Sequence, residues 1–294
     1  MTSQGSEGQF GPGAKKRPPV LLRRPKSREE TSEHGQSVHI GTPRQYGRDS
    51  LREDLGFVQT LPSCRCHLDG AGKLGFDTPM RIDHLVWYNS DLAEGRRFFS
   101  ERMDCQPLYG GEHPGGGTAN AVMALGPETY LEILGRDPRQ SANTLDAEVK
   151  NLSGSGLYHW AVGGVNLQRL AKRARLAGLE AGPLVPGGRV KPDGSWLGWT
   201  CWGLRDHGFG SLVPFCIDWR GNEHPAVSAP HGGKLASLEV HCPQPDELRR
   251  LFDVLDLAIV VKASETPSVV AVLESGKGLV ELRSFQPVPR GYVI

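Results

Sequence analysis

Histidines and acids stand at repeated positions in this sequence, on short segments of strand-forming residues. His84 lies in the middle of residues 81–88, and His159 lies in the middle of 158–162. A third, weaker copy at 235–240 carries Ser237 where the other two carry histidine. Further along, each copy has one acid among apolar residues, and these acids are Glu132, Asp218 and Glu281. Imidazole and carboxylate groups transfer protons and bind divalent metals, so the pattern indicates acid–base or metal chemistry.

Three related units position these residues. In each unit an alternating apolar and polar segment predicts a strand, a segment of helical period follows, and several further strands come after it. The units cover about residues 80–136, 155–220 and 233–285. Such self-similarity is the mark of an internal repeat and predicts an α+β fold.

Local signals define several elements within the units. Asn89 to Asp91 offers an N-cap for a helix whose apolar stripe packs into the core. Apolar residues at helical spacing predict helices over 166–179 and 247–257. Pro192-Asp193-Gly194 predicts the turn of a hairpin over 187–199. The glycine-rich stretch 109–120 precedes a strand and lacks the lysine of a nucleotide-binding loop, so tight turning or close approach to a small ligand explains its glycines better.

Composition limits the function classes. The 294 residues carry a formal net charge of +1, which gives no electrostatic basis for binding nucleic acid or an anionic membrane. The sequence has neither an apolar run of membrane-spanning length nor the apolar core of a secretory signal. Its six scattered cysteines fit a reducing compartment, and we expect a cytoplasmic protein. The Cys64-Arg65-Cys66-His67 stretch has no second cluster at zinc spacing and is not interpreted as a metal site.

Residues 1–79 differ in character from the rest. Gly, Pro, Ser, Arg and Glu dominate, and apolar periodicity is absent, so we expect a disordered or dispensable extension. The abrupt change in composition just before Met80 raises the hypothesis that Met80 is the natural start. The organised domain is expected over 80–286, followed by a short tail, 287–294.

The ordered motifs resemble a known superfamily. They are Asp83-His84-Leu85-Val86-Trp87, His113-Pro-Gly-Gly-Gly-Thr118-Ala-Asn120, Tyr130-Leu131-Glu132, Tyr158-His159-Trp160, Arg189 with Trp199, and Pro214 to Trp219 with His224-Pro225. In this arrangement the chain resembles a glyoxalase-like domain protein of the vicinal oxygen chelate superfamily. The resemblance implies βαβββ units whose sheets curl around a cleft, and it is compatible with a homodimer.

The resemblance also implies a divalent metal, held by one ligand on each first strand and one carboxylate on each last strand. Carried over to this chain, it nominates His84, Glu132, His159 and Asp218. Two imidazoles and two carboxylates suit Zn, Fe, Mn or Ni. Asp218 is one methylene shorter than the expected Glu. If the first unit pairs with the third, His159 is replaced by Ser237.

Other polar and aromatic residues are candidates for binding a small-molecule ligand. His113, Thr118 and Asn120 either line the cleft or serve as ordinary turn residues. Arg189 either binds a substrate carboxylate or phosphate or is a surface hairpin residue. Trp199 and Trp219 are candidates for the wall of the pocket, and His224 is either a loop cap or a residue of the pocket rim.

Two functions that use the cleft follow from these expectations, and the third alternative is a structural or interaction protein whose polar residues face solvent or pack without a cavity. The first is a metal-dependent lyase, isomerase or dioxygenase acting on a small oxygenated substrate, in which the metal ligand Glu132 also carries protons. The second is a metal-free protein that binds or sequesters a small molecule in the same cleft.

Overall fold

The computed structural model describes residues 80–141, 143–145 and 147–291, together with three short strands. These strands are β1 (Gln45–Tyr46), β2 (Cys66–Leu68) and β3 (Leu74–Phe76). Apart from them, the predicted extension 1–79 lies outside the described residues, and so does the hypothesis about the natural start.

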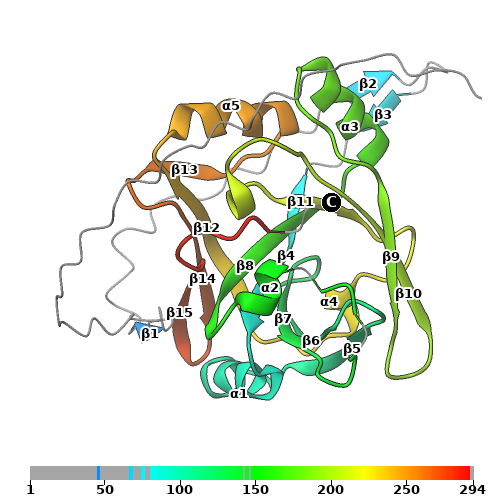
Figure 1. Ribbon diagram of the computed structural model, residues 1–294, viewed down its shortest axis with the longest axis vertical. Coiled ribbons are helices and arrows are strands. Elements are labelled where there is room, and N and C mark those ends of the chain that lie inside the picture. Colours follow the sequence, from blue (N-terminus) through cyan, green and yellow to red (C-terminus); the bar gives the residue numbers. More distant parts are fainter. Residues whose placement is uncertain are drawn as a thin grey trace, which may run out of the picture. The chain divides into compact units, whose positions relative to one another are not determined.

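The first two units share one eight-stranded sheet (Figure 1). The first unit contributes β4 (Arg81–Asn89), β5 (Leu108–His113), β6 (Thr118–Ala124) and β7 (Tyr130–Arg136). The second contributes β8 (Ser155–Gly163), β9 (Val185–Val190), β10 (Trp196–Trp202) and β11 (Phe215–Asp218). The order is β5-β6-β7-β4-β8-β11-β10-β9, with β4 and β8 antiparallel at the junction. The sheet curls so far that its edge strands β5 and β9 contact each other, which makes a nearly closed barrel. The predicted α+β fold is confirmed.

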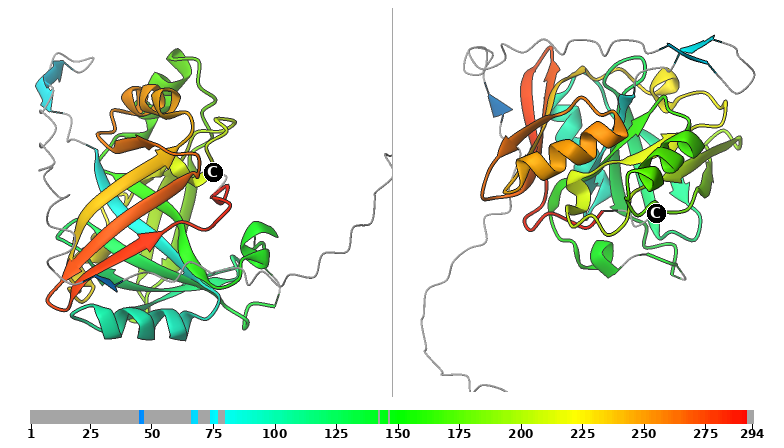
Figure 2. Two further views of the ribbon diagram at one scale, coloured as in Figure 1. Left: turned by 90° about the vertical axis from the view of Figure 1, so that its left-hand side faces the viewer. Right: turned by 90° about the horizontal axis from the view of Figure 1, so that it is seen from above.

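The third unit forms a separate sheet. It contributes β12 (Lys234–Cys242), β13 (Val260–Ala263), β14 (Ser268–Ser275) and β15 (Gly278–Arg283), in the order β1-β15-β14-β12-β13. Figure 2 shows these strands crossing beside the barrel. The question of which units pair is therefore answered: the first pairs with the second, and Ser237 and Glu281 lie in a different sheet from His84 and Glu132.

The predicted helices form close to their expected bounds. Helix α1 (Leu92–Arg102) begins after Asp91, whose side chain accepts hydrogen bonds from the amides of Ala93 and Glu94. Helix α3 (Leu167–Leu176) begins after its N-cap Asn166, and α5 (Pro245–Leu255) lies beside α3 (Figure 2). Shorter helices are α2 (Ala147–Asn151), η1 (Gly210–Leu212) and α4 (Pro225–Ser228). No described helix is long and apolar enough to span a membrane.

Two irregularities in the β4–β8 pairing decide which side chains face into the barrel. The register runs from Ile82 directly to His84 on β4, and it skips Tyr158 on β8. In a regular strand Asp83 and His84 would point to opposite faces. The extra residue instead puts both on the inner face, where their side chains are hydrogen-bonded to each other. The outer face carries the main core, including Leu85, Trp87 and Trp160, which packs with the third unit.

Candidate functional site

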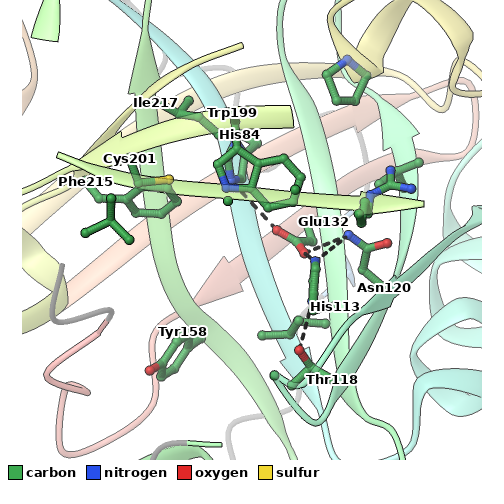
Figure 3. A pocket seen from close by; sticks show the side chains of 18 of the residues that line it. His84, His113, Thr118, Asn120, Glu132, Tyr158, Trp199, Cys201, Phe215 and Ile217 are labelled. Carbon is green, nitrogen blue, oxygen red and sulfur yellow. Dashed lines mark hydrogen bonds and ion pairs between the residues drawn. The ribbon is translucent and has the colours of Figure 1, made fainter. Parts of the chain in front are cut away.

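The barrel encloses a cavity of about 540 Å³. Figure 3 shows polar side chains converging on one side of it and Tyr158, Cys201 and Phe215 on another. The polar lining residues include His84, His113, Thr118, Asn120, Glu132 and Arg189. Apolar and aromatic lining residues include Leu134, Val149, Tyr158, Trp199, Phe215, Ile217 and Trp219. A mostly apolar cavity with a few convergent polar groups is the usual form of a small-molecule site.

Glu132 lies at the centre of the polar group. It faces inward from the middle of β7, and its Oε1 accepts a hydrogen bond of 2.9 Å from Asn120 Nδ2 on β6. Two imidazoles approach the same carboxylate: His84 Nε2 is 3.8 Å from Oε2, and His113 Nε2 is 3.7 Å from Oε1 (Figure 3). A ligand beside Glu132 therefore meets a carboxylate and two imidazoles.

His84 is held in one orientation. Its Nδ1 lies 2.7 Å from Asp83 Oδ1, and its ring stacks on Tyr130 with the centroids 4.6 Å apart. Because an ionised carboxylate can only accept, Nδ1 carries the proton of this hydrogen bond. In the neutral imidazole the lone pair is then on Nε2, the atom that faces Glu132.

Asp83 is 1% exposed and accepts two further hydrogen bonds, at Oδ2. Trp219 Nε1 donates from 3.1 Å and His224 Nε2 from 3.2 Å. Burial alone would raise the pKa of Asp83, but the hydrogen bonds from His224 and His84 overcome it and hold this pKa well below its usual range. Asp83 is therefore a carboxylate at neutral pH.

His224 belongs to this network and does not line the cavity itself. As the N-cap of α4 it accepts a hydrogen bond from Ala226 N at Nδ1, so its proton is on Nε2, the donor to Asp83. The loop-cap alternative for His224 thus describes one of the two hydrogen bonds of its ring.

His113 stands at the end of β5, opposite Thr118 on β6. Its Nδ1 is 2.8 Å from Thr118 Oγ1. Burial lowers the pKa of His113, and the nearby Arg189 lowers it further, although Glu132 opposes both. His113 is accordingly a neutral hydrogen-bonding group at neutral pH.

Only two of the four predicted metal ligands face each other. His159 does not line the cavity, and its Nε2 donates to the carbonyl oxygen of Val213 at 3.0 Å. Burial lowers the pKa of His159 to about 4. Asp218 is exposed at the end of β11, where it accepts a hydrogen bond from Arg220 N. Because Phe215 and Ile217 face inward from β11, alternation turns Asp218 outward.

The donor set does not fit a divalent metal. Among the described residues, no group of three His, Cys, Asp or Glu side chains is arranged to hold an ion. Apolar Phe215 and Ile217 occupy the inward positions of β11, and one oxygen of Glu132 is already bonded to Asn120. We therefore derive no chemical step through a metal.

The sequence interpretation gave no role to Asp83 or Tyr130, although both stood in the motifs. Tyr130 lines the cavity, stacks on His84 and is buried. Burial raises the pKa of Tyr130 well above its usual value, and the charges of Glu132 and Asp83 raise it further. The only sequence signal for Asp83 was its position next to His84. In a regular strand, neighbouring residues point to opposite faces, so the sequence did not predict that Asp83 and His84 share one face.

Comparison with known proteins gives the family and the fold. A family model described as a glyoxalase-like domain matches residues 82–255, more than half of the chain. No curated protein matches the sequence. Among solved structures, a hypothetical protein from Staphylococcus aureus has a TM-score of 0.50 and 13% identity, covering 69% of this chain and 85% of its own.

Two further solved structures cover shorter parts of the chain. A methylmalonyl-CoA epimerase from Streptomyces coelicolor is 19% identical, with a TM-score of 0.37, and covers 50% of this chain and 100% of its own. The methylmalonyl-CoA epimerase from Mycobacterium tuberculosis is 14% identical, with a TM-score of 0.35, and covers 46% of this chain and 84% of its own.

Proposed function

Since the chain belongs to the glyoxalase-like domain family of the vicinal oxygen chelate superfamily, we propose that its cavity moves a proton on a small oxygenated molecule. The observation that carries this proposal is the pair formed by His84 Nε2 and Glu132 Oε2, 3.8 Å apart and both facing the cavity. Two bases that share one space can take up a proton from a bound molecule and give a proton back to it.

The protein side chains define the steps. A base of the pair takes the proton from a carbon next to a carbonyl group, and the electrons of the broken C–H bond move to the carbonyl oxygen as an enolate. Asp83 keeps the His84 lone pair directed at the cavity, and Asn120 holds the other oxygen of Glu132. The proton then returns to the oxygen, which gives the enol, or to the opposite face of the carbon that lost it, which gives the epimer. The net change is an isomerisation, in which nothing is oxidised or reduced.

A second function has its own support. The cavity has a large aromatic surface, formed by Trp199, Trp219, Tyr158 and Phe215. Such a surface also suits a protein that only binds and sequesters a small molecule. The two functions differ in one measurable respect, since sequestration leaves the C–H bonds of the bound molecule intact.

The test is hydrogen–deuterium exchange of small carbonyl compounds in D₂O, followed by proton NMR. The panel contains 2-oxo acids, hydroxyketones and 1,3-dicarbonyl compounds. We expect the wild type to exchange at least one class, and Glu132→Gln to slow this exchange by about 10²-fold or more. Glu265→Gln is the matched control, because Glu265 is exposed in the loop before β14, and it should behave as wild type.

Three outcomes decide between the alternatives. Exchange at the wild-type rate in Glu132→Gln would overturn the proposal. Compounds that bind without exchanging would favour sequestration. Loss of exchange after dialysis against a chelator, with recovery on adding Zn, Fe, Mn or Ni, would restore the metal-dependent function.

A further inference from the structure

We infer that the molecule bound in this cavity is a 2-oxo or 2-hydroxy monocarboxylate whose carboxylate pairs with Arg189. The inference rests on the proposed function, because it names the substrate class of the same site. Three features of the described residues carry it: a buried guanidinium without a partner, an amide oxygen without a donor, and the apolar remainder of the cavity.

Arg189 is a buried charge without a counter-ion among the described residues. It extends from β9, lines the cavity and is 6% exposed. Its Nη1 is buried without a hydrogen-bond partner, and no described acid lies within ion-pair distance of the guanidinium. Burial lowers the pKa of Arg189, and the more distant Glu132 partly opposes this shift. A buried charge is costly unless it is paired, so its missing partner is expected to arrive with the ligand.

Two glycines form a space for this guanidinium. Strand β5 contacts β9 at the closure of the barrel, and a Cβ on Gly110 would lie 3.3 Å from Arg189 Nη2. A Cβ on Gly111 would lie 3.2 Å from Nη1, and the φ of +130° at Gly111 also favours glycine. Side chains at these positions would press on the guanidinium. The sequence thus keeps room for a planar group that binds carboxylates through two parallel hydrogen bonds.

Asn120 indicates a second polar group on the ligand. Its Nδ2 donates a hydrogen bond to Glu132, whereas its Oδ1 is buried and accepts no hydrogen bond. Asn120 Oδ1 and Arg189 Nη2 both lie next to Gly110. A ligand that carries a hydroxyl or enol group close to its carboxylate would satisfy both residues. The enol of a 2-oxo acid has this arrangement, and it is also what proton removal beside the carbonyl group produces.

Charge and size favour a monocarboxylate over a phosphate. Arg189 supplies one positive charge, and the carboxylate of Glu132 stands in the same cavity, so a dianion would meet net repulsion. The remaining space is lined by Leu134, Val149, Tyr158, Phe215 and Ile217. The cavity of about 540 Å³ can therefore take an apolar chain or ring in addition to the acid group.

Ligand-observed NMR titrations with 2-oxohexanoate, its primary amide and inorganic phosphate test the inference. We expect the acid to bind the wild type roughly tenfold to a hundredfold more tightly than the amide, the range for a charged hydrogen-bonded pair. Arg189→Gln should lower the affinity for the acid by the same factor and leave the amide unchanged. Arg175→Gln is the matched control, since Arg175 is exposed on α3.

The acid–amide comparison in the wild type needs no variant, and Arg189→Lys is a second substitution if Arg189→Gln does not fold. The inference is overturned if the amide binds as tightly as the acid, if Arg189→Gln retains the affinity for the acid, or if phosphate binds more tightly than the monocarboxylate. Glu132→Gln should bind 2-oxohexanoate at least as tightly as wild type while losing exchange. Binding that depends on Arg189 but occurs without exchange would reject only the proposed function. Exchange of neutral ketones without preference for the acid would reject only the substrate class.

Discussion

Replacing Asp83 by Asn tests how His84 is positioned. The asparagine side chain has one oxygen and one nitrogen in place of the two carboxylate oxygens. Its nitrogen must face either His84 or the pair formed by Trp219 and His224. Trp219 Nε1 can only donate, so the amide oxygen should stay with Trp219 and His224 while the amide nitrogen faces His84. His84 then accepts at Nδ1 and carries its proton on Nε2, which becomes a donor to Glu132. The substitution therefore exchanges the tautomer of His84.

The structure gives the size of the effect on stability. Asp83 accepts three hydrogen bonds, and bonds to a charged group contribute about 1 kcal/mol more each than neutral ones. The asparagine loses this extra contribution at all three bonds, about 3 kcal/mol in total. For a domain of this size the loss corresponds to a fall in Tm of roughly 6–12 °C. Thermal unfolding by circular dichroism measures the shift. Asp253→Asn, on the exposed face of α5, is the control and should unfold like the wild type.

Two further readouts separate positioning from stability. ¹⁵N chemical shifts of the imidazoles should show the His84 proton on Nδ1 in the wild type and on Nε2 in Asp83→Asn. Measured well below the Tm, the C–H exchange rate should fall at least about tenfold, because His84 then lacks its cavity-facing lone pair. A Tm within about one degree of the wild type, together with an unchanged His84 tautomer, would refute this reasoning.

Two other substitutions give independent tests. His159 titrates near 6.5 in an unfolded chain, whereas burial lowers its folded pKa to about 4. The unfolded state therefore binds more protons between these values, and stability present above pH 6.5 falls by about 3 kcal/mol as the pH drops to 4. His159→Gln, which can still donate to Val213, should flatten this part of the denaturation profile, and a profile like that of the wild type would contradict the assignment. Gly163→Ala would place a Cβ 2.5 Å from Asp83 Oδ2 and should cost about 1–3 kcal/mol. The cost should largely disappear in an Asp83→Ala background, and equal costs in both backgrounds would show that Asp83 is not the residue displaced.

The sequence predicts the repeat and the helices because both depend on local periodicity. The hairpin of β9 and β10 forms around the predicted turn, where Gly194 N bonds to Lys191 O. His84, Glu132, His113, Asn120 and Arg189 reach one cavity because their strands belong to the two units that share a sheet. Pairing of the first two units is a long-range choice, and the sequence alone left it open.

The differences between the sequence-based expectations and the structure arise from strand alternation. Each place where a strand carries an extra residue reverses which side chains face inward. On β4 the extra residue brings Asp83 onto the face of His84, and a regular alternation would have hidden it. On β11 the regular alternation holds, so that Phe215 and Ile217 face inward and Asp218 cannot. Such irregularities depend on pairing between distant segments, and short windows of sequence do not reveal them.

The two repeats contribute unequally to the cavity, and this inequality defines how a substrate would have to lie. The first unit supplies His84, His113, Asn120 and Glu132, whereas the second supplies Arg189 and most of the apolar wall. An anion held by Arg189 must therefore extend from β9 towards β7 for its reacting carbon to meet Glu132. The distance between Arg189, which holds the anion, and Glu132, the base, depends on how β5 contacts β9 near the register shift at Gly110. A change in that short edge would alter which chain lengths react while leaving every acid–base residue in place.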